Sequence, residues 1–193
     1  RELTKAVPFR IDKLLWGTKS IPDTYGYIGF VPGDGFYLKM TCEETDPLRT
    51  YTEYQDPVCL DSAMEAFFMF HGNADSGTAP VYLNLEANAN GALLAQYGPE
   101  RNGRTSFPEE DRKEFCCGAE SAGDCWTLEL RVPLTILERL YGPLDLKKGS
   151  RFACNFYKIS ETKSTEHYAS FSPVRSENPD FHRPEDFADA VIV

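Results

Sequence analysis

The chain has 193 residues, of which 41 % are hydrophobic, so it is long enough to bury a substantial core without disulfide bonds. Its 30 acidic residues outweigh 20 basic ones, and the net charge of −10 argues against nucleic acid or anionic membranes as partners. No apolar run approaches the roughly 20 residues that span a bilayer. We therefore predict one domain over residues 1–193, without a membrane-spanning segment.

The first 24 residues show no regular pattern, and the first clear strand is predicted at Gly35–Glu44. A second strand is predicted at Cys59–Phe70, where apolar residues alternate between the two faces. Glu65 stands among apolar neighbours on one face of this strand. A carboxylate in that position needs a partner such as an arginine, a sugar hydroxyl or a calcium ion.

Strict alternation continues from Tyr82 to Asn90, with Leu83 and Leu85 on one face and Asn84 and Glu86 on the other. The Asn90-Gly91 pair predicts a tight hairpin turn with two left-handed residues, followed by a second strand at Ala92–Tyr97. The next loop carries Arg101 and Arg104. Guanidinium groups are thus expected near a row of amides and a carboxylate, which suits a polar ligand.

Thr105–Gly123 is charged and predicts a long loop or a covering flap. Leu134–Tyr141 has helical spacing between Pro133 and Gly142-Pro143, which predicts one short helix. Together with the absence of a βαβ rhythm, this pattern predicts an all-β fold, an antiparallel β-sandwich. The remaining strands are predicted at Trp126–Val132, Arg151–Ile159, His167–Phe171 and Ala190–Val193. The predicted core includes Leu38, Met40, Phe68, Leu83, Leu85, Trp126, Leu128 and Leu130.

The six cysteines show no metal-binding spacing. Buried free thiols in a reducing compartment explain them better than a disulfide, although Cys125 could pair with Cys116 or Cys117. This favours a cytoplasmic location. A secreted protein remains an alternative, because the numbering begins at Arg1 and a leader could have been removed. The sequence does not indicate an oligomeric state.

Several short phrases, taken in order, resemble family 9-like carbohydrate-binding domains over nearly the whole chain. The phrases are Asp61–Glu65, Tyr82–Asn88 with Gly91, Gly98–Arg101 with Arg104, Asn155–Lys158, His167–Phe171 and Pro179–Phe187. The resemblance implies a β-sandwich similar to the heme- and sugar-binding DOMON group. It also implies a non-catalytic domain that binds an oligo- or polysaccharide of the plant cell wall, such as xylan, cellulose or the ends of their chains.

Better-known members of that family clamp a sugar between two tryptophans and hydrogen-bond it with charged side chains. By position, Phe171 takes the place of one tryptophan, Cys59 the place of the other, and Glu65 matches an acidic hydrogen-bonding residue. A thiol lacks the broad stacking surface of an aromatic ring. The loop aromatics that could replace it are Trp16, Tyr51 and Tyr54. The predicted ligand-binding residues are Glu65, Asn84, Glu86, Arg101, Arg104, Asn155, Lys158 and Phe171.

Each of these residues also has a purely structural interpretation. Phe171 could belong to the core, Arg101 and Arg104 could form surface ion pairs, and Glu86 could lie on a solvated sheet face. A glycosidase is one alternative function, because Glu65 and Glu86 on neighbouring strands could form the carboxylate pair that it needs, at ~5–9 Å.

Heme binding of the DOMON kind is the other alternative function, since it uses a methionine and a histidine as axial ligands. The available side chains are Met40, Met64 and Met69 with His71 or His167. No cofactor is expected otherwise, apart from a structural calcium ion of the kind some relatives carry. Its oxygen ligands could come from Glu43–Asp46 or Glu109–Asp111.

Overall fold

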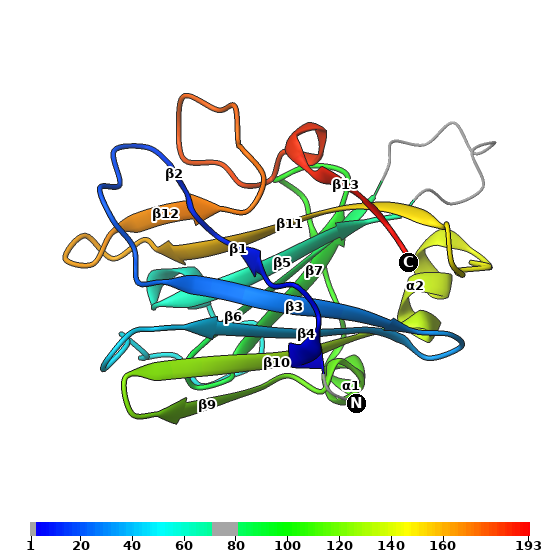
Figure 1. Ribbon diagram of the computed structural model, residues 1–193, viewed down its shortest axis with the longest axis horizontal. Helices are drawn as coiled ribbons and strands as arrows, with labels where there is room; N and C mark the ends of the chain where they lie inside the picture. Colours follow the sequence, from blue (N-terminus) through cyan, green and yellow to red (C-terminus); the bar gives the residue numbers. More distant parts are fainter. Residues whose placement is uncertain (1–2, 71–80) are drawn as a thin grey trace.

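The computed structural model describes residues 3–70 and 81–193. Within these ranges the strands form two antiparallel sheets that pack face to face, which confirms the predicted β-sandwich (Figure 1). The first sheet contains, in spatial order, β1 (Phe9–Arg10), β3 (Thr24–Val31), β4 (Gly35–Cys42), β10 (Cys125–Pro133) and β9 (Gly118–Ala122).

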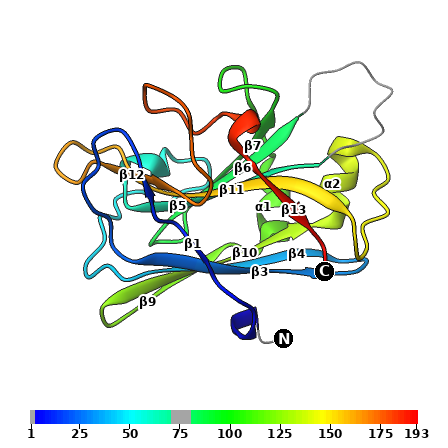
Figure 2. The same cartoon turned by 45° about the horizontal axis from the view of Figure 1, so that its top comes forward.

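The second sheet is built around β11, the longest strand of the described chain. Its spatial order is β2 (Lys13–Leu14), β12 (His167–Ser170), β11 (Arg151–Ser160), β5 (Ala63–Met69), β6 (Tyr82–Asn88), β7 (Leu93–Gly98) and β8 (Thr105–Ser106). The last strand, β13 (Ala188–Val191), pairs with the start of β11. Figure 2 shows the two layers, with the segment between β12 and β13 lying over the outer side of the second sheet.

Among the described residues, two α-helices connect the strands, α1 (Glu109–Arg112) and α2 (Leu134–Tyr141). Helix α2 has the predicted bounds, because Pro133 precedes its first turn and Gly142 ends it with a φ of 77°. No helix in the described ranges is long and apolar enough to cross a membrane. Short 3-10 turns lie at Leu3–Lys5, Val58–Leu60, Lys113–Phe115 and Pro184–Asp186.

The facing sides of the two sheets bury one large apolar cluster. The alternation in the sequence assigned these sides correctly, because side chains two residues apart in a strand share a face. All eight predicted core residues belong to the cluster: Leu38, Met40, Phe68, Leu83, Leu85, Trp126, Leu128 and Leu130. All six cysteines are free thiols, with Cys42 and Cys154 buried.

The substitution Leu85→Ala tests this core directly. Leu85 is buried in the large cluster, so the change should lower the free energy of unfolding by ~2–5 kcal/mol through lost burial and a residual cavity. Denaturant-induced unfolding would measure it. The matched control is Leu14→Ala, which removes the same atoms from a side chain that is 43 % exposed and should change stability by less than ~0.5 kcal/mol. A loss below about 1 kcal/mol at Leu85 would contradict the assignment of faces.

The sequence interpretation missed strand β3 and the regular elements within Thr105–Gly123. Glycine interrupts the β3 pattern at Gly26, where a Cβ would lie 2.5 Å from Phe9 Cζ and 2.8 Å from Met40 Cγ. This glycine therefore leaves room for the Phe9 ring where β1 pairs with β3, a long-range requirement that local periodicity does not show. The predicted loop at Thr105–Gly123 was also wrong in part, because it contains α1 and β9.

The hairpin between β6 and β7 forms as expected, but its turn differs from the prediction. Gly91 has a φ of 75°, whereas Asn90 is not left-handed. The turn is closed by a hydrogen bond from Gly91 N to Asn88 O (2.9 Å), and Asn88 Oδ1 accepts bonds from the backbone of Asn90 and Ala92. Hydrogen bonds to the Asn88 side chain therefore shape the turn, where the prediction had a second left-handed residue.

The outer face of the second sheet is covered rather than solvated. A second, smaller apolar cluster forms there, in which Phe67, Tyr82 and Tyr157 from the sheet pack with Trp16 and Phe181 from loops. Polar residues of β6 are buried beneath the same cover. An enclosed polar region on a sheet face is where a functional site is expected.

Candidate functional site

A cleft of about 220 Å³ opens on the outer face of the second sheet. Residues of the strands form its floor, and residues of five separate connections between strands complete its lining. The floor residues are Glu65, Glu86, Leu94, Gln96, Ile159 and Tyr168. The loop residues are Trp16, Cys59, Arg101, Glu161, Pro179, Asp180, Phe181 and His182.

A larger hollow of about 530 Å³ lies on the outer side of the first sheet, beside β3. Its lining is mainly apolar, and its polar side chains, Asp34 and Tyr37, hydrogen-bond to each other. The cleft on the second sheet is smaller, but it brings buried ionisable groups together beside aromatic rings. That combination makes it the better candidate for a specific site.

The two carboxyl groups of the cleft floor are direct neighbours across a pair of strands. Glu65 of β5 lies opposite Glu86 of β6 in the antiparallel register. Both point to the outer face, Glu65 in phase with Phe67 and Glu86 in phase with Asn84, and they are only 2 % and 6 % exposed. Like charges directly opposite each other destabilise a sheet, so this pair serves something other than stability.

Burial and mutual repulsion disfavour ionisation of this pair. Burial, followed by the charges of Glu86 and Glu161, raises the pKa of Glu65 well above its ordinary value. Burial also raises the pKa of Glu86 to about 7, although the Asn84 hydrogen bond and the Arg104 charge act in the opposite direction. The pair therefore retains a proton near neutral pH.

Arg104 is linked to Glu86 through the side-chain amide of Asn84, which lies between them. Its Nε donates to Asn84 Oδ1 (2.7 Å), and Asn84 Nδ2 donates to Glu86 Oε1 (2.8 Å). The guanidinium also donates to Tyr82 O (2.9 Å) and lies 4.1 Å from the centre of the Tyr82 ring. Neither Arg104 nor Asn84 lines the cleft. Their hydrogen bonds hold the Glu86 carboxyl group in place.

The substitution Arg104→Lys should lower the free energy of unfolding by about 1–3 kcal/mol, because a lysine cannot reproduce the planar fork that serves several acceptors. Thermal or denaturant unfolding would measure the loss. Arg101→Lys is the matched control, since the Arg101 side chain is 50 % exposed and its ion pair should contribute less than ~1 kcal/mol. Equal losses in the two variants would show that the buried arrangement around Arg104 contributes nothing special.

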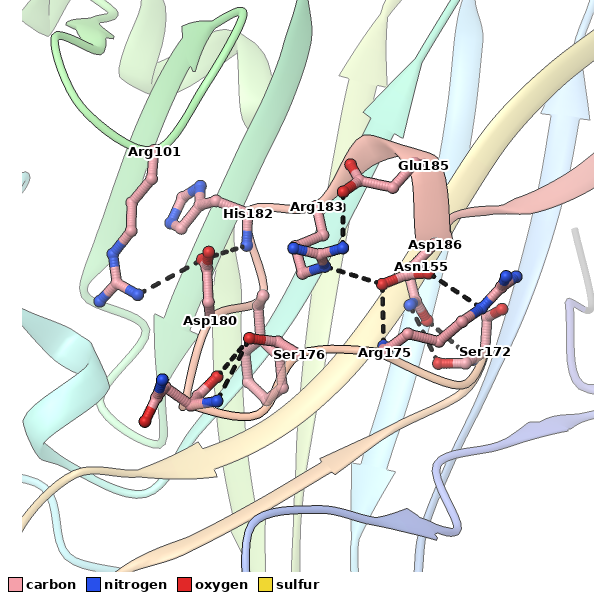
Figure 3. Close-up of polar contacts among 12 residues, drawn as sticks. Arg101, Asn155, Ser172, Arg175, Ser176, Asp180, His182, Arg183, Glu185 and Asp186 are labelled. Atoms are coloured by element: carbon pink, nitrogen blue, oxygen red, sulfur yellow. Dashed lines mark hydrogen bonds and ion pairs between the residues drawn. The ribbon is translucent and has the colours of Figure 1, made fainter.

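Arg101 lies at the cleft itself and connects two loops. Its Nη1 donates to Pro179 O (2.9 Å) and lies 3.3 Å from Asp180 Oδ1. Figure 3 shows Arg101 reaching toward Asp180, which in turn accepts a bond from the His182 backbone N–H (3.0 Å). The half-exposed guanidinium keeps donors available for a ligand.

Trp16 supplies an aromatic ring beside Cys59 in the cleft. Its backbone is left-handed (φ 48°), an unusual conformation for a bulky residue and one that often marks functional sites. The indole Nε1 donates to Ser176 O (2.8 Å), and the ring contacts Tyr168 and Phe181 at centroid distances of 5.3 and 5.2 Å. The other loop aromatics considered from the sequence, Tyr51 and Tyr54, do not line the cleft.

Lys158 was predicted to contact a ligand but lies between the two sheets, fully buried. Its Nζ donates to Ser62 Oγ (2.7 Å), lies 2.9 Å from His167 Nε2 and is 3.7 Å from Glu44 Oε2. The alternation of β11 explains this placement, because Lys158 shares the inner face with Phe156.

Asn155 and Phe171 also lie away from the cleft. Asn155 is fully buried and bonds both ways with the Ser172 backbone, through Nδ2 (3.1 Å) and Oδ1 (2.8 Å), as Figure 3 shows. Phe171 packs against Phe9 and Phe156 at centroid distances of 5.7 and 5.9 Å. Both residues fix the chain where it leaves β12.

The structure adds residues that the sequence interpretation had not selected. Gln96 and Tyr168 follow from strand alternation, since Gln96 lies opposite Asn84 and Tyr168 opposite Ile159 on the outer face. Glu161, Asp180 and His182 reach the cleft from loops, and no local pattern in the sequence indicates that placement.

The acidic loops proposed for calcium are occupied by other partners. Asp111 bonds Arg139 (2.6 Å), Glu109 bonds Arg112 (3.3 Å), and Glu44 lies beside Lys158. Within residues 3–70 and 81–193, no group of three or more acidic, histidine or cysteine side chains could hold a metal ion.

The described side chains considered for heme have other surroundings in the fold. Met40 and Met64 are buried between the sheets, Met69 lies on the opposite face, and His167 contacts Lys158. His71 lies outside the described residues.

Comparisons with known proteins agree with this architecture. The sequence model of a family described as "Carbohydrate-binding family 9" matches residues 3–192. A candidate carbohydrate-binding protein from Bacteroides uniformis superimposes with a TM-score of 0.84 at 22 % identity, covering 98 % of this chain and 88 % of that one. A search of curated proteins found no match.

Two further similar structures are of a family 9 carbohydrate-binding module from Caldicellulosiruptor kristjanssonii. The complex with glucose has a TM-score of 0.63 at 10 % identity and covers 99 % of this chain and 86 % of that one. The complex with cellotriose has a TM-score of 0.62 at 11 % identity, with coverages of 98 % and 84 %. At these identities the likeness establishes the fold.

Proposed function

The chain belongs to carbohydrate-binding family 9, and on that premise we propose that the cleft on its second sheet binds the end of a β-linked glucan or xylan chain. One observation carries the proposal: the nearly buried Glu65 carboxyl group faces a cleft that also contains the fixed indole ring of Trp16. Sugars are bound by that combination of an apolar stacking surface and directed hydrogen bonds.

The size of the cleft favours the end of a chain over its middle. Its volume of about 220 Å³ lies below the roughly 300–1,000 Å³ typical of sites for drug-sized ligands. The Pro179–Asp180 segment, held by Arg101, also stands at its edge. We propose that one terminal ring enters and that the next ring remains at the opening.

Each lining group has a separate role in this proposal. Trp16 stacks on the apolar face of the ring and takes over the position that Cys59 cannot serve. Glu65 and Glu86 accept hydrogen bonds from sugar hydroxyls, while Arg101 and Gln96 donate to hydroxyl oxygens. Asn84 and Arg104 position Glu86, and Asn155, Lys158 and Phe171 support the surrounding fold.

Calorimetric titration with glucose, cellobiose, cellotriose and xylotriose tests the proposal. We expect Kd values on the order of 0.1–1 mM, or about 4–5.5 kcal/mol, because a single stacking wall limits the buried apolar area. Cellobiose and cellotriose should bind with similar affinity if only a chain end enters. Absence of heat and of any competing signal with all four sugars would contradict the proposed function.

We propose binding without catalysis. Glu65 and Glu86 stand side by side on the floor of the cleft, as cross-strand neighbours, whereas the carboxyl groups of a glycosidase flank the scissile bond. Incubation with aryl glycosides should therefore release no phenol above background. Turnover that disappeared in a Glu65→Gln variant would favour the glycosidase alternative.

A further inference from the structure

The cleft contains more acidic groups than its own cations balance. Arg101 is the cation in its lining, and it is already paired with Asp180 at 3.3 Å. His182 adds no charge, because burial, together with the nearby arginines, lowers its pKa to about 3. Three carboxyl groups of the lining have no such counter-charge there: Glu65, Glu86 and Glu161.

Glu65 is the least satisfied of these groups. It is only 2 % exposed, and among the described residues no hydrogen bond to its carboxyl group is present. Glu86, by contrast, accepts a bond from Asn84 (2.8 Å). The charged groups that act on Glu65 are Glu86 from β6, Glu161 from the loop after β11 and Arg101 from the β7–β8 loop. A buried carboxyl group without a partner is strongly unfavourable, so it indicates a ligand that supplies donors.

We propose that the cleft selects sugars that carry a primary ammonium group, with the ammonium bound between Glu65 and Glu86. This inference rests on the proposed carbohydrate function and narrows it to amino sugars. An ammonium group has three N–H donors and no acceptor, so it matches two adjacent carboxyl groups. It also brings the positive charge that the lining lacks, while an anionic uronic acid would meet repulsion.

Because the carboxyl pair holds a proton, binding of an amino sugar should be detectable as proton release. Burial and mutual repulsion keep the pair partly protonated in the free protein, with the pKa of Glu86 raised to about 7. An ammonium ion between the two groups favours ionisation of both, so a proton should leave when an amino sugar binds. Glucose carries no charge and should release fewer protons.

The test compares glucose with glucosamine, 6-amino-6-deoxyglucose, N-acetylglucosamine and glucuronate at pH 6.5 by calorimetry. At least one of the two amino sugars should bind about ten-fold tighter than glucose, because a hydrogen bond between charged groups is worth roughly a power of ten in affinity. N-acetylglucosamine, in which acetylation removes the charge, should show no gain in affinity over glucose. Heats measured in buffers of different ionisation enthalpy should show proton release for the amino sugar.

Two variants distinguish binding of an amino sugar at this site from a general attraction of a cationic sugar to an acidic protein. Glu65→Gln should reduce the ratio of amino-sugar to glucose affinity to about two-fold or less. Glu120→Gln makes the same carboxyl-to-amide replacement on the exposed strand β9 and should leave that ratio unchanged. A ratio that persists in Glu65→Gln, or that disappears in both variants, would overturn the inference.

The outcomes also distinguish this inference from the proposed function. Binding of glucose or cellobiose without any gain for either amino sugar would overturn the ammonium site and leave the carbohydrate site standing. Binding of none of the sugars would overturn both.

Discussion

Replacement of Trp16 by alanine is expected to weaken cellobiose binding about ten-fold. A sugar face covers about one third of the roughly 150–250 Å² that an aromatic side chain can bury, and at ~25 cal/mol per Å² this gives about 1.5 kcal/mol. The ring is held in place by its bond to Ser176 O and by contact with Phe181, so little ordering is needed on binding. Calorimetric titration of both proteins measures the difference.

Two further variants make this result specific. Trp16→Phe retains a smaller ring and should lose only about three-fold in affinity. Phe171→Ala removes an aromatic side chain that packs against Phe9 and Phe156, away from the cleft, and should reduce stability while leaving affinity within two-fold. A larger loss of affinity in Phe171→Ala than in Trp16→Ala would place the sugar elsewhere.

The Glu65–Glu86 pair should make the free protein less stable as the pH rises. A carboxyl group with a raised folded-state pKa binds its proton more tightly in the folded state, so its stabilising contribution is complete below the unfolded pKa and is lost as the pH rises through the folded value. For Glu86 this window runs from 4.5 to about 7. The shift corresponds to about 3 kcal/mol, at 1.36 kcal/mol per pH unit.

Two buried histidines oppose this trend over part of the same window. Burial is the main cause that lowers the pKa of His167 to about 4 and of His182 to about 3, so their contribution to stability rises with pH up to 6.5. The contribution of Glu86 is therefore measured as the difference between the wild type and Glu86→Gln, in which the histidine effects cancel.

Denaturant unfolding at pH 4.5 and pH 8 provides this difference. Relative to the wild type, Glu86→Gln should become more stable by about 3 kcal/mol between the two pH values. Glu120→Gln, on the exposed strand β9, should show no comparable change. A difference for Glu86→Gln that is flat with pH, or that runs in the opposite direction, would show that the pair is not forced to share protons.

Local periodicity predicted the parts of the fold that depend on neighbouring residues. β4, β6 and β10 alternate strictly, β7 is an apolar run after the Asn90-Gly91 turn, and α2 lies between a proline and a glycine. β3 was missed because its glycines weaken the pattern, and the reason for Gly26 is a close approach by Phe9 and Met40. Such an approach exists only once distant strands have assembled.

The residues of the candidate site also fall into those that local periodicity could predict and those that depend on distant contacts. Glu65 and Glu86 could be selected from the sequence because each is a carboxylate in a strongly patterned strand. Lys158 and Asn155 showed the same kind of polar interruption in an apolar strand, yet their partners, Glu44 and Ser172, bring them into the interior. A polar residue in an apolar strand therefore indicates either a site or an internal bond, and only the position of the distant partner decides between them.

The loop residues of the cleft were the hardest to predict. Trp16 was identified as a replacement for the ring absent at Cys59, but its position depends on a bond to Ser176, 160 residues away in the chain. Asp180 likewise reaches the cleft through its contact with Arg101. These contacts join loops whose lengths and conformations are not encoded by periodicity.

The two tryptophans allow the most direct test of where a sugar binds. Trp126 is buried between the sheets, where its indole Nε1 donates to Glu44 (3.1 Å), whereas the Trp16 ring lines the cleft. In ¹⁵N-labelled protein each indole N–H gives its own signal, and Trp16→Phe identifies which signal belongs to which residue. On titration with cellobiose, the Trp16 signal should shift saturably with the Kd found by calorimetry, and the Trp126 signal should stay fixed. Saturable binding that leaves the Trp16 signal unmoved would contradict the site.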